Sequence, residues 1–382
     1  MAGALVVTGA TGFLGSHLLA CLLEADRDCQ VICLARRRGT AARDRVFEAL
    51  HTARHDQGAR PMPSGWQQRV LVFEEDFCSP DASLSPQARA AIQALRPRAF
   101  WHCAASVQFT ETATGEVWDT NVNGLQRTLE LASDIGASVF NHVSTAYVAG
   151  TLSGRVPETI HLRPETFNNV YEESKLRGEH MVDAYCRAHG LGYRIFRPSV
   201  IIGHTQTCRS SSNAGMYRVL DLLEKFHEVV EAKQPGHFQK HSLKVGIDPE
   251  ATCNLIPVDL VAEEMLSLAA CGDRSLGRVF HITNERTLKV AEFFEAACPL
   301  AGIGRFEIAT STTRLSAVDQ LFRKGLTHYS PYFNCRKTFD RTNGRAVGVD
   351  RLQADFHWDQ ERLKVFIQSW LARPKREKEV VS

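Results

Sequence analysis

The order of segments along this chain predicts an α/β fold: a doubly wound parallel sheet with helices on both faces, followed by a smaller C-terminal lid. Short apolar runs alternate with longer stretches in which apolar residues recur at helical spacing. Alternation of this kind is typical of consecutive strand-helix-strand units, which build a parallel sheet. The strand-like runs are 4–7, 31–34, 70–73, 99–102, 138–143 and 193–196, and the helical stretches include 13–23, 87–95, 116–135 and 172–188.

The first strand-like run leads into a glycine-rich loop at residues 9–15. On a strand-to-helix turn, Gly9 permits the tight turn, Gly12 lets the backbone approach a pyrophosphate, and Gly15 lets the helix pack closely on the strand. The N-terminus of the helix attracts the phosphate charge. The loop therefore predicts a dinucleotide site in a Rossmann-type domain, with a turn that is merely glycine-rich as the alternative. The residues predicted to contact the dinucleotide here are Gly9, Thr11, Gly12, Phe13, Leu14 and Gly15.

The residues after the second strand-like run indicate which dinucleotide to expect. An NAD enzyme usually carries an acidic residue about 20 positions past the glycines, where it holds the ribose 2′-hydroxyl. Guanidinium groups stand there in this chain, and they suit a 2′-phosphate. Arg36 follows the strand most closely, and Arg37, Arg38 or Arg45 could share the phosphate. NADP(H) is therefore the predicted cofactor, with a solvated basic run as the alternative for any single arginine.

Three residues further along the chain predict proton transfer at a carbonyl. Tyr171 and Lys175 are four residues apart, so they share one face of a helix. A lysine ammonium beside a phenol favours the phenolate, and we expect it to lower the Tyr171 pKa toward neutral pH. Thr145 follows a strand-like run, so its hydroxyl is expected at the carboxyl edge of the sheet, where it would hydrogen-bond the reacting oxygen. The alternatives are an ordinary helix-surface pair and a threonine that only ends a strand.

Length and composition predict a globular cytoplasmic enzyme. The chain has 382 residues, 44% hydrophobic composition and a net charge of +2, which argues against a nucleic-acid surface. Eleven cysteines without a CxxC pair favour reduced thiols over disulfides or a zinc site, and no metal site is expected. The first residues form a strand-like run instead of a signal peptide, and no apolar run is long enough to span a bilayer.

The alternation of strands and helices breaks down after the sixth strand-like run. We expect residues 1–203, rejoined by 254–270, to form the NADP-binding domain, and residues 204–253 and 271–382 to form a substrate-binding lid. A helix-like run that starts at Met216 is predicted to line an apolar channel to the reacting carbonyl, with an ordinary amphipathic helix packed on the core as the alternative. An apolar stripe near the C-terminus would pack on the core or on a second subunit.

Six further motifs, together with the glycine loop, resemble those of extended short-chain dehydrogenases/reductases over most of the chain. They are Asp76-Phe77, His102 to Ala105, Asn121 to Gly124, Ser144 to Tyr147, Tyr171 to Lys175 and Arg197 to Ser199. The resemblance implies that Lys175 also holds the nicotinamide ribose, that Tyr171 contacts the cofactor, and that Asn121 supports the helix behind the site. The other cofactor contacts that it implies are Asp76 and Phe77 at the adenine, Cys103, Ala104 and Ala105 along the cofactor, and Pro198, Ser199 and Val200 near the nicotinamide carboxamide.

Within that superfamily the chain is most similar to the thioester reductases and fatty acyl-CoA reductases, the male-sterility-type branch. The similarity runs through residues 33–36, 42–50, 104–109, 143–148 and 329–333. The resemblance implies reduction of an acyl thioester, held on coenzyme A or on the pantetheine arm of a carrier protein, to an aldehyde and in some members to an alcohol. Because these motifs come without an adenylation or carrier segment or a long C-terminal helical domain, a free-standing reductase is implied.

Three other functions fit parts of the pattern. A ketone or alcohol dehydrogenase, or a sugar-nucleotide epimerase, needs the same threonine, tyrosine and lysine, and this alternative stays open. A dehydratase usually carries Asp-Glu directly after the threonine, whereas Ala146-Tyr147 stand there in this chain. A non-enzymatic NADPH-sensing protein is expected to have lost Tyr171 or Lys175, and both are present.

Overall fold

The computed structural model describes residues 3–77, 79, 84–310, 312–349 and 356–373. The chain divides into two compact units. The larger unit contains Met1–Ile201, Leu255–Glu285 and Lys337–Phe356, and the smaller unit contains Ile202–Asn254, Arg286–Arg336 and His357–Ser382.

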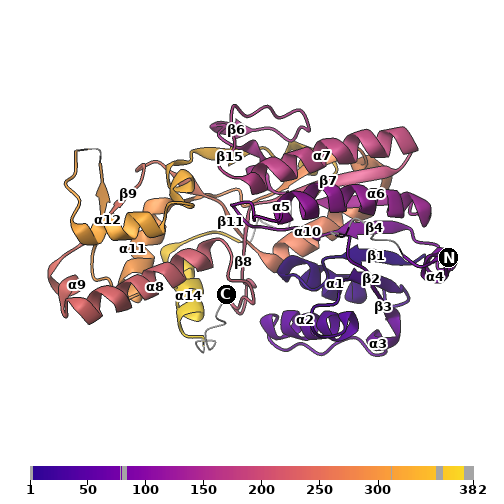
Figure 1. Cartoon of the computed structure of the whole chain (residues 1–382), viewed down its shortest axis with the longest axis horizontal. Coiled ribbons are helices and arrows are strands. Elements are labelled where there is room, and N and C mark those ends of the chain that lie inside the picture. The colour runs from indigo at the N-terminus through magenta and orange to yellow at the C-terminus, as the bar shows by residue number, and fades with distance from the viewer. Residues whose placement is uncertain (1–2, 78, 80–83, 311, 350–355, 374–382) are drawn as a thin grey trace. The chain divides into compact units, whose positions relative to one another are not determined.

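A sheet of seven strands forms the centre of the larger unit, in the order β12-β7-β5-β4-β1-β2-β3 (Figure 1). Every neighbouring pair in this sheet is parallel. The order runs outward in both directions from β1 and β4, which is the arrangement of a doubly wound α/β fold and confirms the predicted fold class. The strands are β1 (Leu5–Thr8), β2 (Val31–Ala35), β3 (Val70–Glu74), β4 (Ala99–His102), β5 (Val139–Val143), β7 (Gly192–Pro198) and β12 (Arg278–Ile282).

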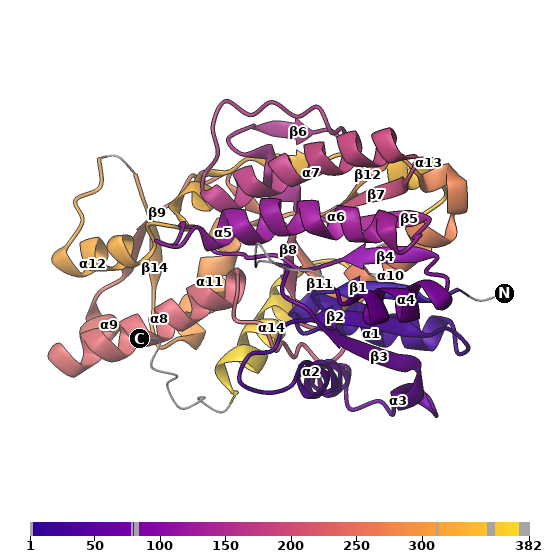
Figure 2. The ribbon, with the colours of Figure 1, turned by 45° about the vertical axis from the view of Figure 1, so that its right-hand side comes forward.

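Helices cover both faces of this sheet, as Figure 2 shows. Side chains alternate along a strand, so Leu5 and Val7 of β1 join one core cluster while Val6 joins the other. Because both faces are buried, the strands are mostly apolar, as parallel strands usually are, although they also carry buried polar side chains such as His102 and His142. The first face is covered by α1 (Phe13–Ala25), α2 (Ala42–Asp56) and α10 (Val258–Ala270), and the second by α4 (Pro86–Ala94), α6 (Gly124–Asp134) and α7 (Val170–His189).

Short elements complete the larger unit. A one-turn π-helix, η1 (Asp119–Asn123), lies between α5 (Glu116–Trp118) and α6, so the helix expected over 116–135 is interrupted by a wider turn. Two strand pairs lie outside the main sheet: β6 (Gly154–Val156) with β15 (Lys337–Phe339), and β8 (Val200–Ile202) with β11 (Leu255–Pro257). The remaining short helices are α3 (Trp66–Arg69), η2 (Ala146–Ala149), η3 (Gly272–Ser275) and α13 (Thr342–Ala346).

The smaller unit packs helices around an aromatic core. Phe294 lies at its centre, with ring centroids 5.5 Å from Phe306 and 5.3 Å from Phe333. Over the described residues of both units, no helix is long and apolar enough to cross a membrane. The elements of the smaller unit are α8 (Met216–Lys233), α9 (His237–Lys240), β9 (Leu243–Gly246), β10 (Thr252–Cys253), β13 (Leu288–Lys289), α11 (Val290–Leu300), β14 (Phe306–Ala309), α12 (Ala317–Gly325), η4 (Ser330–Asn334) and α14 (Gln360–Leu371).

The two units differ from the expected domain boundaries in one respect. The sequence assigned all of 271–382 to the lid, whereas residues 271–285 and Lys337–Phe356 belong to the larger unit. The reason is strand pairing: β12 extends the main sheet beside β7, and β15 pairs with β6. A single strand of five residues carries little local signal, so its pairing partner decides its place in the fold.

Candidate active site

The carboxyl ends of four neighbouring strands bring the predicted site residues to one edge of the sheet. β1 ends at Thr8 before the glycine loop, β4 ends before Cys103, β5 ends before Thr145, and β7 ends at Pro198. These four strands are adjacent and parallel, in the order β7-β5-β4-β1. In open α/β sheets this edge is where ligands bind.

Thr145 and Tyr171 form the centre of this edge. The buried Thr145 side chain is hydrogen-bonded to the Tyr171 side chain, and its hydroxyl also accepts a hydrogen bond from the Tyr147 amide at 3.3 Å. Tyr171 lies in the first turn of α7. That helix begins where the Asn169 side chain accepts a hydrogen bond from the Glu172 amide at 3.0 Å. This cap fixes the start of α7 and therefore the position of Tyr171.

Tyr171 and Lys175 do not interact as the sequence predicted. Burial raises the pKa of Tyr171 to about 12, although its hydrogen bond with Thr145 acts in the opposite direction. Burial also lowers the pKa of Lys175 to about 8. The Lys175 ammonium donates to the carbonyl oxygen of Val143 at 2.6 Å. The expected lowering of the Tyr171 pKa is therefore wrong for this structure, and the phenol is protonated at neutral pH.

Two buried contacts hold α7 in place behind its reactive face. Glu179 of α7 pairs with Arg197 of β7 through both carboxylate oxygens, at 2.8 and 2.6 Å, and both side chains are 0% exposed. Asn121 of η1 donates to the Ser174 hydroxyl of α7 at 2.9 Å, and it binds both the amide and the carbonyl of Ser106. The helix is thus tied both to the sheet and to the loop that follows β4.

The loop before α7 joins the same network. Arg197 donates to the carbonyl oxygens on either side of Glu158, at 3.4 and 2.8 Å. The Glu158 carboxylate accepts hydrogen bonds from the main-chain amides of His281 and Asn343, at 2.7 and 2.5 Å. Burial raises the pKa of Glu158 to about 7 and lowers that of His281 to about 3. The loop is therefore held on both sides by charged or buried groups.

A row of buried polar side chains crosses the sheet beside the site. Thr8, His102 and His142 are register neighbours on β1, β4 and β5. The Thr8 hydroxyl lies 2.9 Å from the Nδ1 of His102, whose ring stacks on that of His142 with centroids 5.5 Å apart. Burial, followed by the charge of Lys175, lowers the pKa of His102 to about 3 and that of His142 well below its usual value, so both rings are neutral. In the described part of the chain, no group of three or more His, Cys, Asp or Glu residues could hold a metal ion.

The glycine loop has the shape that a pyrophosphate requires. Gly9 has a left-handed backbone, with φ 74°, and a Cβ there would lie 2.5 Å from the Ala104 amide nitrogen. A Cβ on Gly15 would overlap the Gly9 carbonyl oxygen, so the helix packs closely on the strand. Gly12, the N-cap of α1, provides no side-chain hydrogen bond, and the first turn of α1, which is described in full, holds no acidic residue. The residues present therefore fit a dinucleotide phosphate at this helix N-terminus.

The arginines after β2 fall into two groups. Arg45 donates to the carbonyl oxygen of Arg36 at 2.5 Å, and burial, followed by the charges of Arg38 and Arg36, lowers its pKa. The guanidinium groups of Arg38 and Arg36 are therefore close enough to repel that of Arg45, and a bound anion would relieve this repulsion. Arg37 instead pairs with Glu74 at 3.2 Å, and its side chain is 64% exposed. The structure brings Arg36, Arg38 and Arg45 together and directs Arg37 elsewhere.

The other predicted cofactor residues lie at or just after the carboxyl ends of β3, β4 and β7. The Asp76 carboxylate lies 4.0 Å from the Arg36 guanidinium, and the Phe77 carbonyl accepts a hydrogen bond from Arg127 at 2.7 Å. Main-chain hydrogen bonds at 3.2 and 3.1 Å tie Cys103 and Ser199 to neighbouring strands. These hydrogen bonds hold the main chain in place at Cys103 and Ser199. The predicted residues in these segments are Asp76, Phe77, Cys103, Ala104, Ala105, Pro198, Ser199 and Val200.

Sequence reasoning missed the residues that position α7. Glu179 could have been found, because it follows Lys175 by the same four-residue step that separates Lys175 from Tyr171. Arg197 was noticed only as part of a motif, without a role. Glu158 has no local signal, since its partners are more than 100 residues away in the chain.

One family of known proteins matches most of the larger unit. The model of the family described as "Male sterility protein" matches residues 7–265. The chain belongs to this family. The matched segment is an NAD(P)-binding domain, and the match confirms the resemblance that the motifs indicated.

Curated relatives of the chain are larger proteins. The nonribosomal peptide synthetase asaC of Aspergillus flavus is 24% identical over 97% of this chain and 36% of its own length. Human fatty acyl-CoA reductase 2 is 25% identical over 73% of this chain and 57% of its own length. The chain therefore spans 36% and 57% of the lengths of these two relatives.

Solved structures confirm the fold. The terminal R domain from the myxalamid PKS-NRPS biosynthetic pathway has a TM-score of 0.75 at 19% identity, covering 97% of this chain and 91% of that domain. The UDP-glucuronic acid 4-epimerase of Bacillus cereus, solved in complex with NAD, has a TM-score of 0.62 at 18% identity and covers 96% and 98%. At these identities the similarity concerns the fold alone.

Proposed function

We propose that the chain is an NADPH-dependent reductase that converts acyl thioesters to aldehydes, with further reduction to alcohols as a second step. The hydrogen-bonded Thr145 and Tyr171 side chains, at the same sheet edge as the glycine loop, carry this proposal. Relatives named as a fatty acyl-CoA reductase and as a terminal R domain support the choice of an acyl thioester as substrate.

The roles of the three residues follow from their protonation and contacts. When bound, NADPH supplies a hydride to the carbonyl carbon of the thioester. Tyr171, protonated at neutral pH, donates its proton to the carbonyl oxygen, and the Thr145 hydroxyl stabilises the charge that develops there. The hemithioacetal then breaks its carbon–sulfur bond, which releases the aldehyde and a thiol that takes up the hydroxyl proton. Lys175, held by the Val143 carbonyl, keeps a positive charge beside the site.

The same proposal assigns the cofactor to the glycine loop and to the arginine cluster. Gly9, Gly12 and Gly15 would hold the pyrophosphate, and Arg36 and Arg45, with Arg38, would hold the 2′-phosphate. Arg37 is left out, because it pairs with Glu74. The residues assigned to the adenine, the ribose and the nicotinamide are Asp76, Phe77, Cys103, Ala104, Ala105, Asn121, Tyr171, Lys175, Pro198, Ser199 and Val200.

The acyl group would reach this site on coenzyme A or on the pantetheine arm of a carrier protein, and the smaller unit would bind it. The relatives support both carriers, since one is named for acyl-CoA and another is a nonribosomal peptide synthetase. A ketone or alcohol dehydrogenase or an epimerase is the second candidate function, because the B. cereus epimerase shares the fold.

Following NADPH absorbance and thiol release together separates these functions. We expect lauroyl-CoA to consume NADPH and to release one thiol, detected with a thiol reagent, for each hydride transferred to the thioester. An acyl carrier protein loaded with the same chain tests the second carrier. Oxidation of NADPH by ketones, without thiol release from any thioester, would reject the thioester proposal and support the dehydrogenase.

A further inference from the structure

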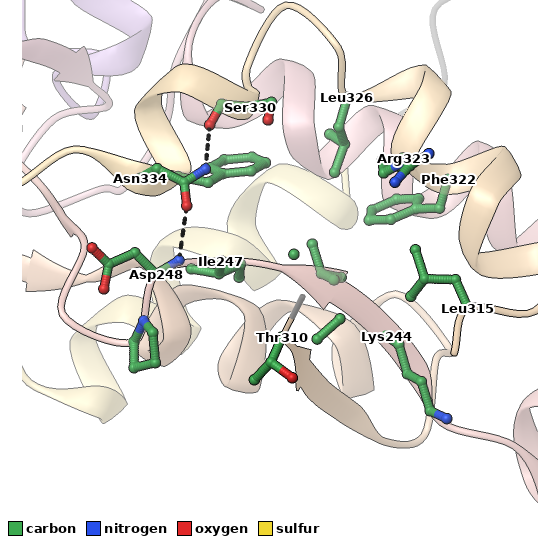
Figure 3. A pocket seen from close by; sticks show the side chains of 15 residues that line it. Lys244, Ile247, Asp248, Thr310, Leu315, Phe322, Arg323, Leu326, Ser330 and Asn334 are labelled. Carbon is green, nitrogen blue, oxygen red and sulfur yellow. Dashed lines mark hydrogen bonds between the residues drawn. The ribbon is translucent and has the colours of Figure 1, made fainter. Parts of the chain in front are cut away.

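The smaller unit contains a cavity that none of the assignments above uses. It has a volume of about 570 Å³ and lies between β9, β14, α12 and η4 (Figure 3). Most of its lining is apolar, and Phe322 and Leu326 face Ile247 across it. Volumes of this size are typical of small-molecule sites. The lining residues are Lys244, Val245, Gly246, Ile247, Asp248, Pro249, Ala309, Thr310, Leu315, Phe322, Arg323, Leu326, Ser330, Phe333 and Asn334.

Hydrogen bonds hold the two sides of this cavity at both ends. At one end, the Asp319 carboxylate of α12 accepts a hydrogen bond from the Lys244 amide of β9 at 2.9 Å. At the other end, the Asp248 amide donates to the Asn334 side chain of η4 at 3.1 Å, and the Asp248 carboxylate pairs with Arg336 at 2.5 and 2.6 Å. Because α12 and η4 are both hydrogen-bonded to β9 or to Asp248 after it, the walls of the cavity are held in place.

The aromatic walls of the cavity are also supported from behind. Phe322 packs against Phe226 with ring centroids 4.9 Å apart, and Phe333 packs edge-on against Phe294 at 5.3 Å. Phe294 contacts Phe322 as well, at 6.5 Å. These contacts hold the Phe322 and Phe333 rings in place on one side of the cavity.

Charge is distributed unevenly around the mouth of the cavity. The carboxylate at the Asp248 end is neutralised by Arg336, whereas Lys244 and Arg323 lie at the opposite end in Figure 3. Within the residues that the structure describes, neither of these two cations has an ion-pair partner. An apolar interior with two unpaired cations at one end is complementary to a molecule that has an apolar chain and a negative charge.

We propose that this cavity binds an alkyl chain carried by an anionic molecule. The volume of about 570 Å³ lies within the range of sites that bind small organic molecules. A fatty carboxylate and the acyl chain of an acyl-CoA share this chemistry. The proposal concerns binding alone and does not depend on the reductase chemistry.

Isothermal titration of the whole chain with laurate tests the binding. We expect laurate to bind at least tenfold more tightly than butyrate, which lacks most of the chain, and than dodecyltrimethylammonium, which has the chain but the opposite charge. Ala309 lines the cavity from β14, and Ala309→Phe should weaken laurate binding more than tenfold by filling the space. The midpoint of thermal unfolding by circular dichroism checks that this variant is folded.

Charge variants keep the test decisive if Ala309→Phe fails to fold. The double variant Lys244→Gln/Arg323→Gln should weaken laurate binding about tenfold or more, because it removes charge-assisted contacts. Lys240→Gln/Arg305→Gln, two exposed cations of the same unit outside the cavity lining, is the matched control and should change the affinity less than twofold. Absence of laurate binding to the unmodified chain, or equal binding by all variants, overturns the proposal.

Kinetics with two thioesters identify the natural source of the chain. If Ala309→Phe raises KM for lauroyl-CoA but not for butyryl-CoA, the cavity holds the acyl chain of the substrate. If KM for lauroyl-CoA is unchanged while laurate affinity is lost, the cavity is a separate site for free carboxylates. Both results support the cavity as an alkyl-chain site, and laurate binding remains measurable even if no thioester is reduced.

Discussion

Replacement of Arg197 by methionine should destabilise the larger unit strongly, because it leaves the buried carboxylate of Glu179 without its partner. The two side chains are 0% exposed and make two hydrogen bonds to each other. The variant also removes the donor to two loop carbonyls, at 3.4 and 2.8 Å. Removing one partner of a buried ion pair costs about 3–5 kcal/mol, so we expect the free energy of unfolding to fall by that amount.

Urea unfolding followed by far-UV circular dichroism measures this loss. The matched control is Arg187→Met on α7, the helix that carries Glu179, where the guanidinium pairs with Asp183 and is 68% exposed. An exposed pair contributes about 0.2–1 kcal/mol, so this variant should be almost as stable as the unmodified chain. The double variant Arg197→Met/Glu179→Leu should recover most of the loss, because no charge is left buried. The reasoning is refuted if Arg197→Met costs no more than Arg187→Met, or if the double variant is as unstable as Arg197→Met.

Three further outcomes are expected. Tyr171→Phe should lower kcat about 10²–10⁴-fold, because it removes the proton donor, while NADPH fluorescence titration shows almost unchanged cofactor binding. Arg36→Ala/Arg45→Ala should weaken NADPH binding roughly 10- to 100-fold and leave NADH binding unchanged in the same titration. His102 and His281, whose pKa values burial lowers to about 3, should make the free energy of unfolding fall as the pH is lowered from about 7 to 5 in urea titrations, because the unfolded chain then binds more protons.

Each of these outcomes has a control variant or a result that would contradict it. A Tyr171→Phe enzyme that keeps more than about half its activity would contradict the assigned role, since general acids contribute far more than that. Arg37→Ala should leave NADPH affinity unchanged, because that guanidinium pairs with Glu74. The pH slope is opposed by Glu158, whose raised pKa of about 7 stabilises the fold at low pH and loses that effect as the pH rises through 7. His102→Asn should therefore flatten the slope, and an unchanged slope would exclude His102 as its source.

The parts of the fold with a local signal could be predicted from the sequence. The apolar run before the glycines and the helical spacing after them give β1 and α1, and similar signals give β2, β3, β4, β5 and β7 of the main sheet. β12 lacked such a signal, because its place depends on pairing with β7 more than 80 residues earlier in the chain. The predicted strands are therefore correct where the hydrophobic pattern repeats along the chain. The prediction fails for β12, whose position depends on pairing with a distant strand.

In the candidate active site, too, some features could be predicted from the sequence and others depend on contacts between distant residues. The reactive pair of Thr145 and Tyr171 could be anticipated, because Thr145 follows the end of β5 and Tyr171 lies in the first turn of α7. The direction of the Tyr171 pKa shift could not, since it depends on how deeply the phenol is buried and on the Val143 carbonyl that takes the Lys175 ammonium. A shared helix face predicts that two side chains are near each other, but not which groups they contact.

The π turn η1 lies between α5 and α6, so the position of Asn121 depends on the number of residues in this turn as well as on their types. In an α-helix each residue advances by about 100°, so deleting one residue from Asp119–Asn123 would rotate Asn121 relative to one of its two partners, Ser106 and Ser174. A substitution elsewhere in the turn leaves that geometry in place. Related proteins in which an asparagine makes these two contacts should therefore tolerate substitutions at the other positions of the turn far better than the deletion of one residue from it.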